Sequence, residues 1–377
     1  MKILQILPAL GQGGVERGTI EIAQALTAAG IPSGVVSAGG PMTHALEKLG
    51  VRHYTLPTNS KNPFVLAKNA GAIAKIAATE GYTLMHVRSR APAWSVKWAS
   101  RECGVPWMAT FHGVYGLSPR CLKLPYNRVM LQGVRTIAVS DYVRRHILEN
   151  YEVDSTKVVR IHRGADVNVF RPDAVSAEDA LAKKTKQYHF APDIPVITLP
   201  GRLTRWKGQE VFLEAVRLMR HKRVGLLFLG SDQGRVDYSD RLREMASSLP
   251  NETQVVFRDH SREIERVYAL SEIVVNASTA QPEAFGRTIP EAQAMGCLVL
   301  GTAHGGACET IEDGVTGFLV PPGDAVAMAR RLDEMLDMST EAKAKMREAA
   351  IASVRNNFSV AKMCERTLEL YRSLHGE

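Results

Sequence analysis

The sequence predicts an α/β protein with two doubly wound domains that face each other across a cleft. Two observations predict this class. Short apolar runs alternate with helical patterns from Ile3 onward, and the same rhythm begins again at Val196. This alternation indicates βαβ units, and therefore parallel sheets with helices on both faces. The length of 377 residues also exceeds one ordinary core, so two domains of under about 200 residues each are expected.

In the first half, strands are predicted where apolar runs are short, and helices where apolar residues recur every three or four positions. The predicted strands are 3–10, 34–37, 53–56, 83–87, 107–110 and 136–139. The predicted helices are 16–29, 42–49, 66–78 and 94–103. A parallel sheet follows from this order because each helix returns the chain to the edge where the next strand begins.

The second half repeats the pattern with continuous apolar strands at 196–199, 225–229 and 272–276, which is typical of strands buried on both faces. Between the halves, 170–195 is polar and charged, and we interpret it as the interdomain connection with room for a short helix. The stretch 340–377 predicts two helices and no further strand. We therefore expect domains at 1–172 and 173–357, followed by a final helix at 358–377.

Composition limits the class of protein. Hydrophobic residues make up 45% of the chain and charged residues 23%, as in soluble globular proteins. The first eight residues predict a strand and not a signal peptide, and no apolar run approaches the roughly 20 residues of a membrane-spanning helix. The five cysteines form no C-x-x-C pair, so neither a metal site nor a disulfide framework is expected. We expect a cytoplasmic protein.

The net charge of +8 suggests an anionic partner, and the excess is concentrated in 81–150. That stretch holds three acidic residues and ten basic ones: Arg88, Arg90, Lys97, Arg101, Arg120, Lys123, Arg128, Arg135, Arg144 and Arg145. Two interpretations explain this basic stretch equally well. It forms a face for acidic lipid headgroups or for a phosphorylated acceptor, or its basic residues lie on ordinary solvated helix faces. Nucleic acid is disfavoured because aromatic residues are few and no nucleic-acid-binding module pattern is present.

A glycine-rich turn follows the first predicted strand. Gly13 and Gly14 precede a helix, and such a turn lets backbone N–H groups approach an anionic or polar ligand. The turn is not a dinucleotide fingerprint, because Glu16 replaces its third glycine and no acidic residue ends the second strand near Ser37. A hydride-transfer enzyme is therefore disfavoured, and a plain tight turn is the alternative.

A second segment, 201–208, also follows a strand and precedes a helix. Arg202 and Lys207 stand in it, and both are suited to a diphosphate because hydrogen bonds between charged groups are strong. It is not a Walker loop, which would end in Gly-Lys-Ser or Gly-Lys-Thr. The alternative interpretation is an exposed basic loop.

Two glutamates eight positions apart form the most informative segment. Pro290 marks a helix start, which places Glu283 in a loop and Glu291 in the first helical turn. Backbone N–H groups around Gly286 and Arg287 would then point along the helix dipole, suited to a phosphate. Thr288 and Glu291 also have the spacing of a capping box, a purely structural alternative for Glu291. Carboxylates for sugar hydroxyls, together with cations for a diphosphate, indicate a nucleotide-sugar site.

In their order along the chain, these segments resemble the retaining glycosyltransferases of the large GT-B family four, which includes many lipopolysaccharide and phosphatidylinositol glycosyltransferases. The resemblance runs almost from end to end. The matching segments are Gly13–Glu16, Phe111–Gly113, Val139–Ser140, Arg163–Asp166, Phe170–Pro172, Gly201–Gly208, Glu283–Glu291, Gly305–Glu309 and Asp313–Pro321. The family implies two Rossmann-like domains and a C-terminal helix that crosses back to the first domain.

The resemblance also implies roles for single residues. Gly13 and Gly14 would lie beside the diphosphate and the sugar, and His112 near the transferred hexose, although a histidine there is by itself often an ordinary core or loop residue. Arg202 and Lys207 would neutralise the diphosphate.

In the glutamate segment, Glu283 would hold hexose hydroxyls and Glu291 the ribose hydroxyls. Phe285, Gly286 and Arg287 would complete the nucleotide-sugar site. Catalysis is thus assigned to His112, Glu283, Arg202 and Lys207.

The implied reaction moves a hexose from a UDP-, GDP- or ADP-linked sugar to a cell-envelope glycolipid or polysaccharide, as in lipopolysaccharide core synthesis. No cofactor is expected. No D-x-D sequence occurs, so we expect no metal, with Arg202 and Lys207 in its place. The basic first half would face the inner surface of the membrane. The alternatives are a nucleotide-sugar-binding protein without activity, a transferase with a small soluble acceptor, and a sugar-nucleotide epimerase.

The chain departs from the family pattern at three places. Arg163 stands where the family usually has Asn, Glu272 stands where it usually has Asp, and 230–234 is a loose version of a Gly-Asp-Gly loop. We expect these positions near the base-binding and hinge regions. The nucleotide, the sugar and the acceptor therefore stay open.

Overall fold

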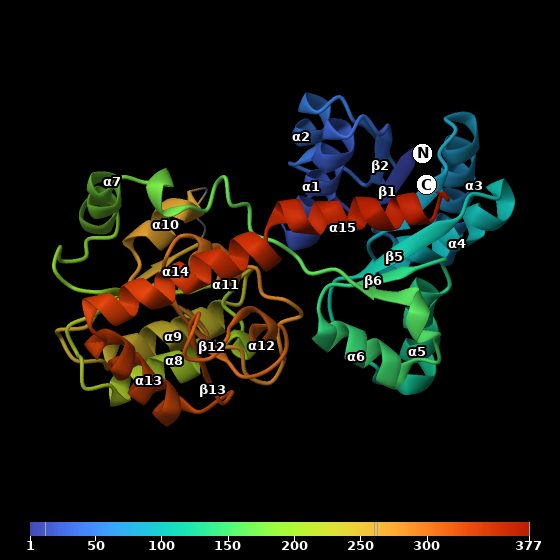
Figure 1. The fold of residues 1–377 in the computed structure, drawn as a ribbon. Coiled ribbons are helices and arrows are strands. Elements are labelled where there is room, and N and C mark those ends of the chain that lie inside the picture. Colours follow the sequence, from blue (N-terminus) through green and yellow to red (C-terminus); the bar gives the residue numbers. More distant parts are fainter. Residues whose placement is uncertain (12, 260, 262, 377) are drawn as a thin grey trace. The chain divides into compact units, whose positions relative to one another are not determined.

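The computed structural model describes residues 1–11, 13–259, 261 and 263–376. The chain forms two compact units (Figure 1). Unit 1 comprises Met1–Arg163 together with Val360–Glu377, and unit 2 comprises Gly164–Ser359. The sequence places the first boundary at 172, whereas this division falls after Arg163. The segment 170–195, interpreted above as a connection, therefore lies within unit 2.

Unit 1 contains a parallel sheet of seven strands in the order β3-β2-β1-β4-β5-β6-β7. The strands are β1 (Ile3–Ile6), β2 (Ser33–Ser37), β3 (Arg52–Thr55), β4 (Leu84–Val87), β5 (Trp107–Phe111), β6 (Thr136–Ala138) and β7 (Val158–Arg160). From β1 the chain proceeds outward to β3, and it then continues with β4 on the other side of β1. The order thus reverses between β1 and β4, and ligands bind doubly wound sheets at such a point.

The helices of unit 1 connect these strands, except the last one, which rejoins unit 1 after the chain has passed through unit 2. They are α1 (Gly14–Ala28), α2 (Thr43–Lys48), α3 (Pro63–Thr79), α4 (Arg90–Cys103), α5 (Arg120–Arg128), α6 (Asp141–Asn150) and α15 (Val360–Ser373). The last helix packs against α1, as the red and blue ribbons show in Figure 1. Met363, Leu368 and Tyr371 are buried in one cluster with Ile22 and Leu26 of α1. The C-terminal helix is therefore part of the core of unit 1.

Unit 2 contains a parallel sheet of six strands in the order β10-β9-β8-β11-β12-β13, with its reversal between β8 and β11. The strands are β8 (Val196–Pro200), β9 (Gly225–Leu229), β10 (Gln254–Arg258), β11 (Ile273–Asn276), β12 (Leu298–Thr302) and β13 (Phe318–Val320). The helices are α7 (Ala177–Ala182), α8 (Gln209–Leu218), α9 (Val236–Ser247), α10 (Ile264–Leu270), α11 (Thr288–Ala294), α12 (Ala307–Thr310), α13 (Ala325–Asp337) and α14 (Thr340–Asn357). Two doubly wound α/β units confirm the predicted fold class.

The predicted elements differ from the observed ones mainly at their ends. The first strand ends at Ile6 and not at 10, because the chain turns at Pro8. Its backbone then bonds to the loop after β2, where Leu10 N donates to Gly39 O at 2.8 Å. The short helix expected in 170–195 is α7, which packs against α10. Among the described residues, no helix combines the length and apolar character that crossing a bilayer requires.

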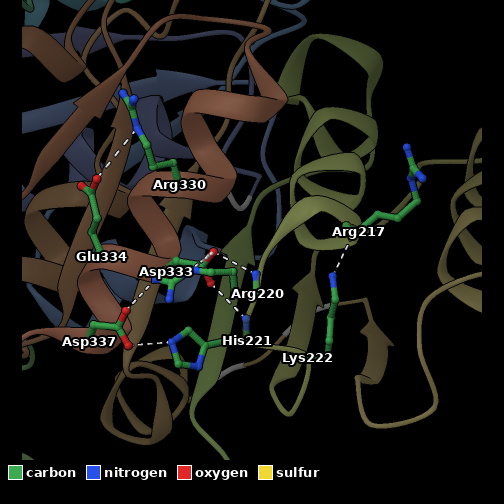
Figure 2. A network of polar contacts seen from close by, with 8 residues as sticks. All are labelled: Arg217, Arg220, His221, Lys222, Arg330, Asp333, Glu334 and Asp337. Carbon is green, nitrogen blue, oxygen red and sulfur yellow. Dashed lines mark hydrogen bonds and ion pairs between the residues drawn. The ribbon is translucent and has the colours of Figure 1, made fainter.

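The amino end of the sheet in unit 2 is closed by a polar network between α13 and the loop after α8 (Figure 2). The buried Asp333 carboxylate accepts backbone N–H bonds from Arg220 at 2.8 Å and from His221 at 3.0 Å. Asp337, one turn further along α13, accepts from the side chains of the same two residues at 2.7 Å each. The network fixes the chain just before it enters β9.

Candidate functional site

The two predicted segments of unit 2 meet at the carboxyl end of its sheet. Lys207 lies in the loop after β8, and Glu283 lies in the loop after β11, on either side of the point where the strand order reverses. The Lys207 ammonium forms an ion pair with the Glu283 carboxylate. The two side chains are only 13% and 15% exposed. A cation and a carboxylate thus stand together where doubly wound sheets bind ligands.

Backbone contacts hold these two loops against each other. Thr279 N donates to Trp206 O at 2.8 Å. Gly208 adopts φ +72° at the start of α8, and a Cβ there would overlap the Ala277 carbonyl. Only glycine combines that backbone conformation with so close an approach. The lysine is therefore presented from a loop whose position is fixed by the neighbouring strand connection.

A third loop, which follows β12, completes the edge. Gly306 N donates to the Glu283 carbonyl at 2.9 Å. His304 lies beside Glu283, and its buried Nε2 atom has no hydrogen-bond partner in the described part of the chain. Burial lowers the pKa of His304, while the bond to the Ser278 backbone and the charge of Glu283 oppose this. His304 is thus neutral near pH 7 and places an unpartnered polar atom beside Glu283 among the residues described.

The second glutamate of the segment occupies the predicted first turn of α11. Glu291 is 5% exposed, and Arg287 Nε lies 3.5 Å from its Oε1 atom. The capping-box alternative does not hold, because Arg287 is the N-cap residue and no side chain caps this helix. With only seven residues, α11 also has a short dipole, so the phosphate attraction expected from it is small.

The other residues predicted for this site are placed differently. Arg202 is exposed, and no ion pair involves it within the described ranges. Phe285 is 3% exposed and packs against Phe358 with ring centroids 6.1 Å apart, so its side chain belongs to the core. Gly286 adopts φ +77° beside Glu283. The structure thus brings Lys207 and Glu283 together but not Arg202.

In unit 1, the predicted residues also lie at the carboxyl end of the sheet. Gly13 is the N-cap residue of α1, and Gly14 is its first residue. The carbonyl of Gly14 accepts a hydrogen bond from Arg163 Nη2, and Arg163 Nη1 donates to His112 Nδ1 at 3.2 Å. Arg163 therefore joins the glycine turn to the loop that follows β5.

His112 is held in an electropositive environment. Its Nε2 atom is buried and has no hydrogen-bond partner among the residues described. Burial lowers the pKa of His112 well below its usual value, and the charges of Arg163 and Arg88 and the neighbouring His86 lower it further. Arg88 is itself buried, with its Nε atom donating to Gln5 Oε1 at 3.1 Å. His112 is therefore neutral near pH 7.

Three polar residues of these edges were not predicted. Arg163 was noted only as a departure from the family pattern. Arg88 was counted among the basic residues of a surface, and that prediction is wrong because Arg88 is buried. His304 immediately precedes Gly305–Glu309, one of the segments that match the family pattern. One sequence signal was present, since Arg88, His112 and His304 each follow an apolar strand, where the side chains of parallel sheets reach the ligand edge.

Glu272 was expected near the base-binding region, and the structure corrects this. It lies just before β11, at the amino end of the sheet. Its carboxylate pairs with Lys343 at 3.0 Å and with Arg347 at 2.8 Å, both on α14. Glu272 thus ties β11 to α14 and takes no part in the carboxyl-end site.

Two doubly wound units with these residues at their carboxyl edges form the architecture of GT-B glycosyltransferases. Residues 12–169 match the family model "Glycosyltransferase Family 4", and residues 182–353 match "Glycosyl transferases group 1". A solved glycosyltransferase from Rickettsia africae is 39% identical, with a TM-score of 0.90 over 99% of this chain and 98% of that one. The protein is therefore a member of the family 4 glycosyltransferases.

Two further proteins, less similar in sequence, match over almost the whole chain. The D-inositol 3-phosphate glycosyltransferase of Mycobacterium ulcerans is 26% identical over 100% of this chain and 81% of its own length. The structure of Anabaena Alr3699/HepE in complex with UDP has a TM-score of 0.86 at 24% identity, covering 99% of this chain and 100% of that one. A further structure of the same Anabaena protein contains UDP-glucose.

Proposed function

We propose that the protein transfers a hexose from a nucleotide diphosphate sugar to a cell-envelope glycolipid or polysaccharide, with retention at the anomeric carbon and without a metal ion or other cofactor. The observation that carries the donor half of this proposal is the ion pair between Lys207 and Glu283 at the strand-order reversal of unit 2. It supplies, in one place, a cation for the diphosphate and a carboxylate for sugar hydroxyls.

The pair explains how a donor would be bound. When a diphosphate arrives, its oxygens replace the carboxylate beside the Lys207 ammonium. The released Glu283 carboxylate then accepts hydrogen bonds from the hexose hydroxyls, and His304 lies beside it as a further polar group. We assign the ribose hydroxyls to Glu291 at the start of α11. Arg202, which is exposed, would reach the diphosphate by a change of its side-chain rotamer.

The chemical step follows from the charges. The bond between the anomeric carbon and the phosphate oxygen breaks, and that oxygen takes the bonding electrons. The acceptor hydroxyl forms the new bond from the same face, and its proton passes to the leaving phosphate. Lys207 stabilises the negative charge that grows on this phosphate, which is the kind of preorganised electrostatic contribution that is large in enzymes.

The acceptor proposal rests on helix α5. Arg120, Lys123 and Arg128 are exposed on this helix, and Leu122 beside them is 68% exposed. Basic side chains around an exposed apolar residue suit an anionic membrane surface that carries a glycolipid. Peripheral attachment at the inner face of the membrane follows from this proposal.

A small soluble acceptor is the second candidate, because the Mycobacterium ulcerans relative is a D-inositol 3-phosphate glycosyltransferase. Pelleting with vesicles that contain anionic lipid separates the two. Under the membrane proposal, the double change Arg120→Glu and Lys123→Glu abolishes pelleting. The same charge reversals at exposed Lys61 and Lys75 leave it unchanged. Wild-type protein that stays in the supernatant contradicts the membrane proposal.

Donor binding is tested first by thermal shift with UDP, GDP, ADP and their sugar conjugates. UDP is the first choice because the Anabaena relative was solved with it. A ligand at about ten times its Kd stabilises the protein by about 1.4 kcal/mol. We expect Lys207→Ala to abolish this shift and Lys222→Ala, at the amino end of the sheet, to keep it. A shift that survives in Lys207→Ala contradicts the proposed site.

Retention is tested on the product. Proton NMR of the newly formed linkage distinguishes the two anomers by the coupling of the anomeric proton. We expect the configuration of the donor to be kept. An inverted linkage would exclude the same-face displacement and would require a base to activate the acceptor.

A further inference from the structure

Arg163 and His112 form a contact that restricts the chemistry of the imidazole. The Arg163 Nη1 atom lies 3.2 Å from His112 Nδ1. A guanidinium carries only donors, so the Nδ1 atom of His112 must accept in this bond. A neutral imidazole has one N–H, which is therefore at Nε2. That atom is buried and has no hydrogen-bond partner among the described residues.

The position of the guanidinium is built into helix α1. Its Nη2 atom donates to the Gly14 carbonyl, and its terminal atoms fill the space where residue 18 would carry a Cβ. Gly18 lies inside a helix, where glycine is unfavourable compared with alanine. Contact with the guanidinium accounts for glycine at this position. Residues far apart in the sequence are thus fitted to one another around Arg163.

We propose that Arg163 is a positioning residue that holds His112 as the neutral Nε2–H tautomer, so that His112 donates a hydrogen bond to an oxygen of the bound substrate and does not act as a base. The ligand is identified by this chemistry as an oxygen acceptor, either a sugar hydroxyl or a phosphate oxygen. Taking it as part of a nucleotide sugar rests on the proposed function. The state of the ring in the ligand-free protein does not.

The surroundings of His112 agree with this assignment. The charged and titratable groups that face it are Arg163, Arg88 and His86, and the Tyr115 side chain bonds to the His112 backbone. His86 lies between Tyr371 Oη at 2.5 Å and Thr110 Oγ1 at 2.7 Å, and burial lowers its pKa well below the usual value. None of these groups is an acid that would stabilise an imidazolium. Protonation of Nδ1 would also place an N–H against the guanidinium.

The direct test is the nitrogen NMR signature of the His112 ring in the full-length, ligand-free protein. His112→Gln identifies its signals among those of the 11 histidines. In the wild type we expect the Nε2–H tautomer and a pKa of the His112 ring well below the ordinary value for histidine. In Arg163→Met we expect a mixture of tautomers and a protonation closer to the ordinary value of about 6.5. A wild-type Nδ1–H signal, or an unchanged signature in Arg163→Met, overturns the proposal.

A second variant keeps the Arg163 charge and removes only the space that the guanidinium occupies beside helix α1. Gly18→Ala forces the guanidinium away from its place, and we expect it to reproduce the tautomer mixture of Arg163→Met. Gly71→Ala is the matched control, because Gly71 also lies inside a helix but a Cβ there meets nothing within 4 Å. A wild-type His112 signature in folded Gly18→Ala overturns the proposal. Arg163→Lys, which retains a donor, is expected to restore part of the Nε2–H signal.

The pH dependence of turnover separates this role from a merely structural one. With a UDP-linked sugar as donor, we expect wild-type kcat/KM to lack an acidic limb from His112. Arg163→Met is expected to gain a limb with a midpoint closer to 6.5. If the donor proposal itself fails, no turnover is seen, and the NMR result still decides the role of Arg163. A limb of equal midpoint in both proteins contradicts the proposal.

Discussion

The two ends of the sheet in unit 2 each place a carboxylate among basic groups, but they use it differently. At the amino end, the partners of Asp333 include two backbone N–H groups, which cannot leave while the chain is folded (Figure 2). At the carboxyl end, Glu283 is paired with one lysine side chain from another loop. Both carboxylates are largely shielded from water, at 5% exposure for the Asp333 residue and 15% for the Glu283 side chain.

The difference shows that burial alone does not separate a structural carboxylate from a functional one. The identity of the partner does. A backbone amide is satisfied permanently, so the contact contributes to stability. A lysine ammonium can exchange the carboxylate for a ligand oxygen by a rotamer change, so the same kind of contact is compatible with binding. The following predictions test this comparison from the largest expected effect to the smallest.

Lys207→Ala is expected to have the largest effect, and that effect is on catalysis. Loss of one preorganised cation at the leaving phosphate lowers kcat by about 10²–10³-fold, which corresponds to about 3–4 kcal/mol. Steady-state kinetics with the donor found by thermal shift measures it. Lys222→Ala is the control and should keep wild-type kcat. A kcat within about threefold of wild type in Lys207→Ala would show that this end of the sheet is structural too.

Asp333→Ala is expected to act on stability. Two partly buried backbone N–H groups lose their acceptor, so the free energy of unfolding falls by about 2 kcal/mol, while kcat of the folded protein is unchanged. Urea unfolding followed by circular dichroism measures this. Asp337→Ala, which removes a more exposed carboxylate from the same network, should lower the free energy of unfolding by clearly less than Asp333→Ala, because its ion pairs are screened by solvent. Equal losses in both variants would remove the distinction between backbone and side-chain partners.

Glu283→Gln is expected to affect binding of the diphosphate and binding of the sugar in opposite directions. The variant no longer competes with the diphosphate for Lys207, so UDP without a sugar should bind more tightly, by up to about tenfold or 1.4 kcal/mol. Turnover of the sugar nucleotide should fall because the hexose hydroxyls lose a carboxylate. Isothermal titration with UDP provides the measurement. Weaker UDP binding in the variant would mean that the ion pair supports the diphosphate and does not oppose it.

The smallest expected effect is on the pH dependence of stability, and it arises from the buried His86 of unit 1, whose two ring nitrogens are hydrogen-bonded to Tyr371 and Thr110. The folded-state pKa of His86 is lowered by burial, whereas the unfolded chain has a value near 6.5. Below that value the unfolded state binds a proton that the folded state does not, so stability falls as pH decreases. His86 alone contributes a loss of about 0.7 kcal/mol between pH 7 and pH 6. Urea unfolding at several pH values should show this loss, and His86→Gln should reduce it.

Much of the fold was determined by local sequence. Apolar runs and helical periodicity specify a strand or a helix from a few neighbouring residues, so the alternation of the two units was predictable. Pro290 fixed the start of α11 locally, which placed Glu291 in the first turn and Glu283 in the loop before it. The position of Lys207 between a strand and a helix was predictable for the same reason.

Only the tertiary structure decided which of these residues meet. Lys207 and Glu283 are brought together because β8 and β11 are neighbours in the sheet, a pairing that no local pattern contains. The contacts of Arg163 with Gly14 and His112, and the burial of Arg88 in a stretch that composition marks as a basic surface, depend in the same way on packing. Secondary structure arises from interactions between near neighbours in the chain, whereas ion pairs and buried charges depend on distances that exist only once the sheets have formed.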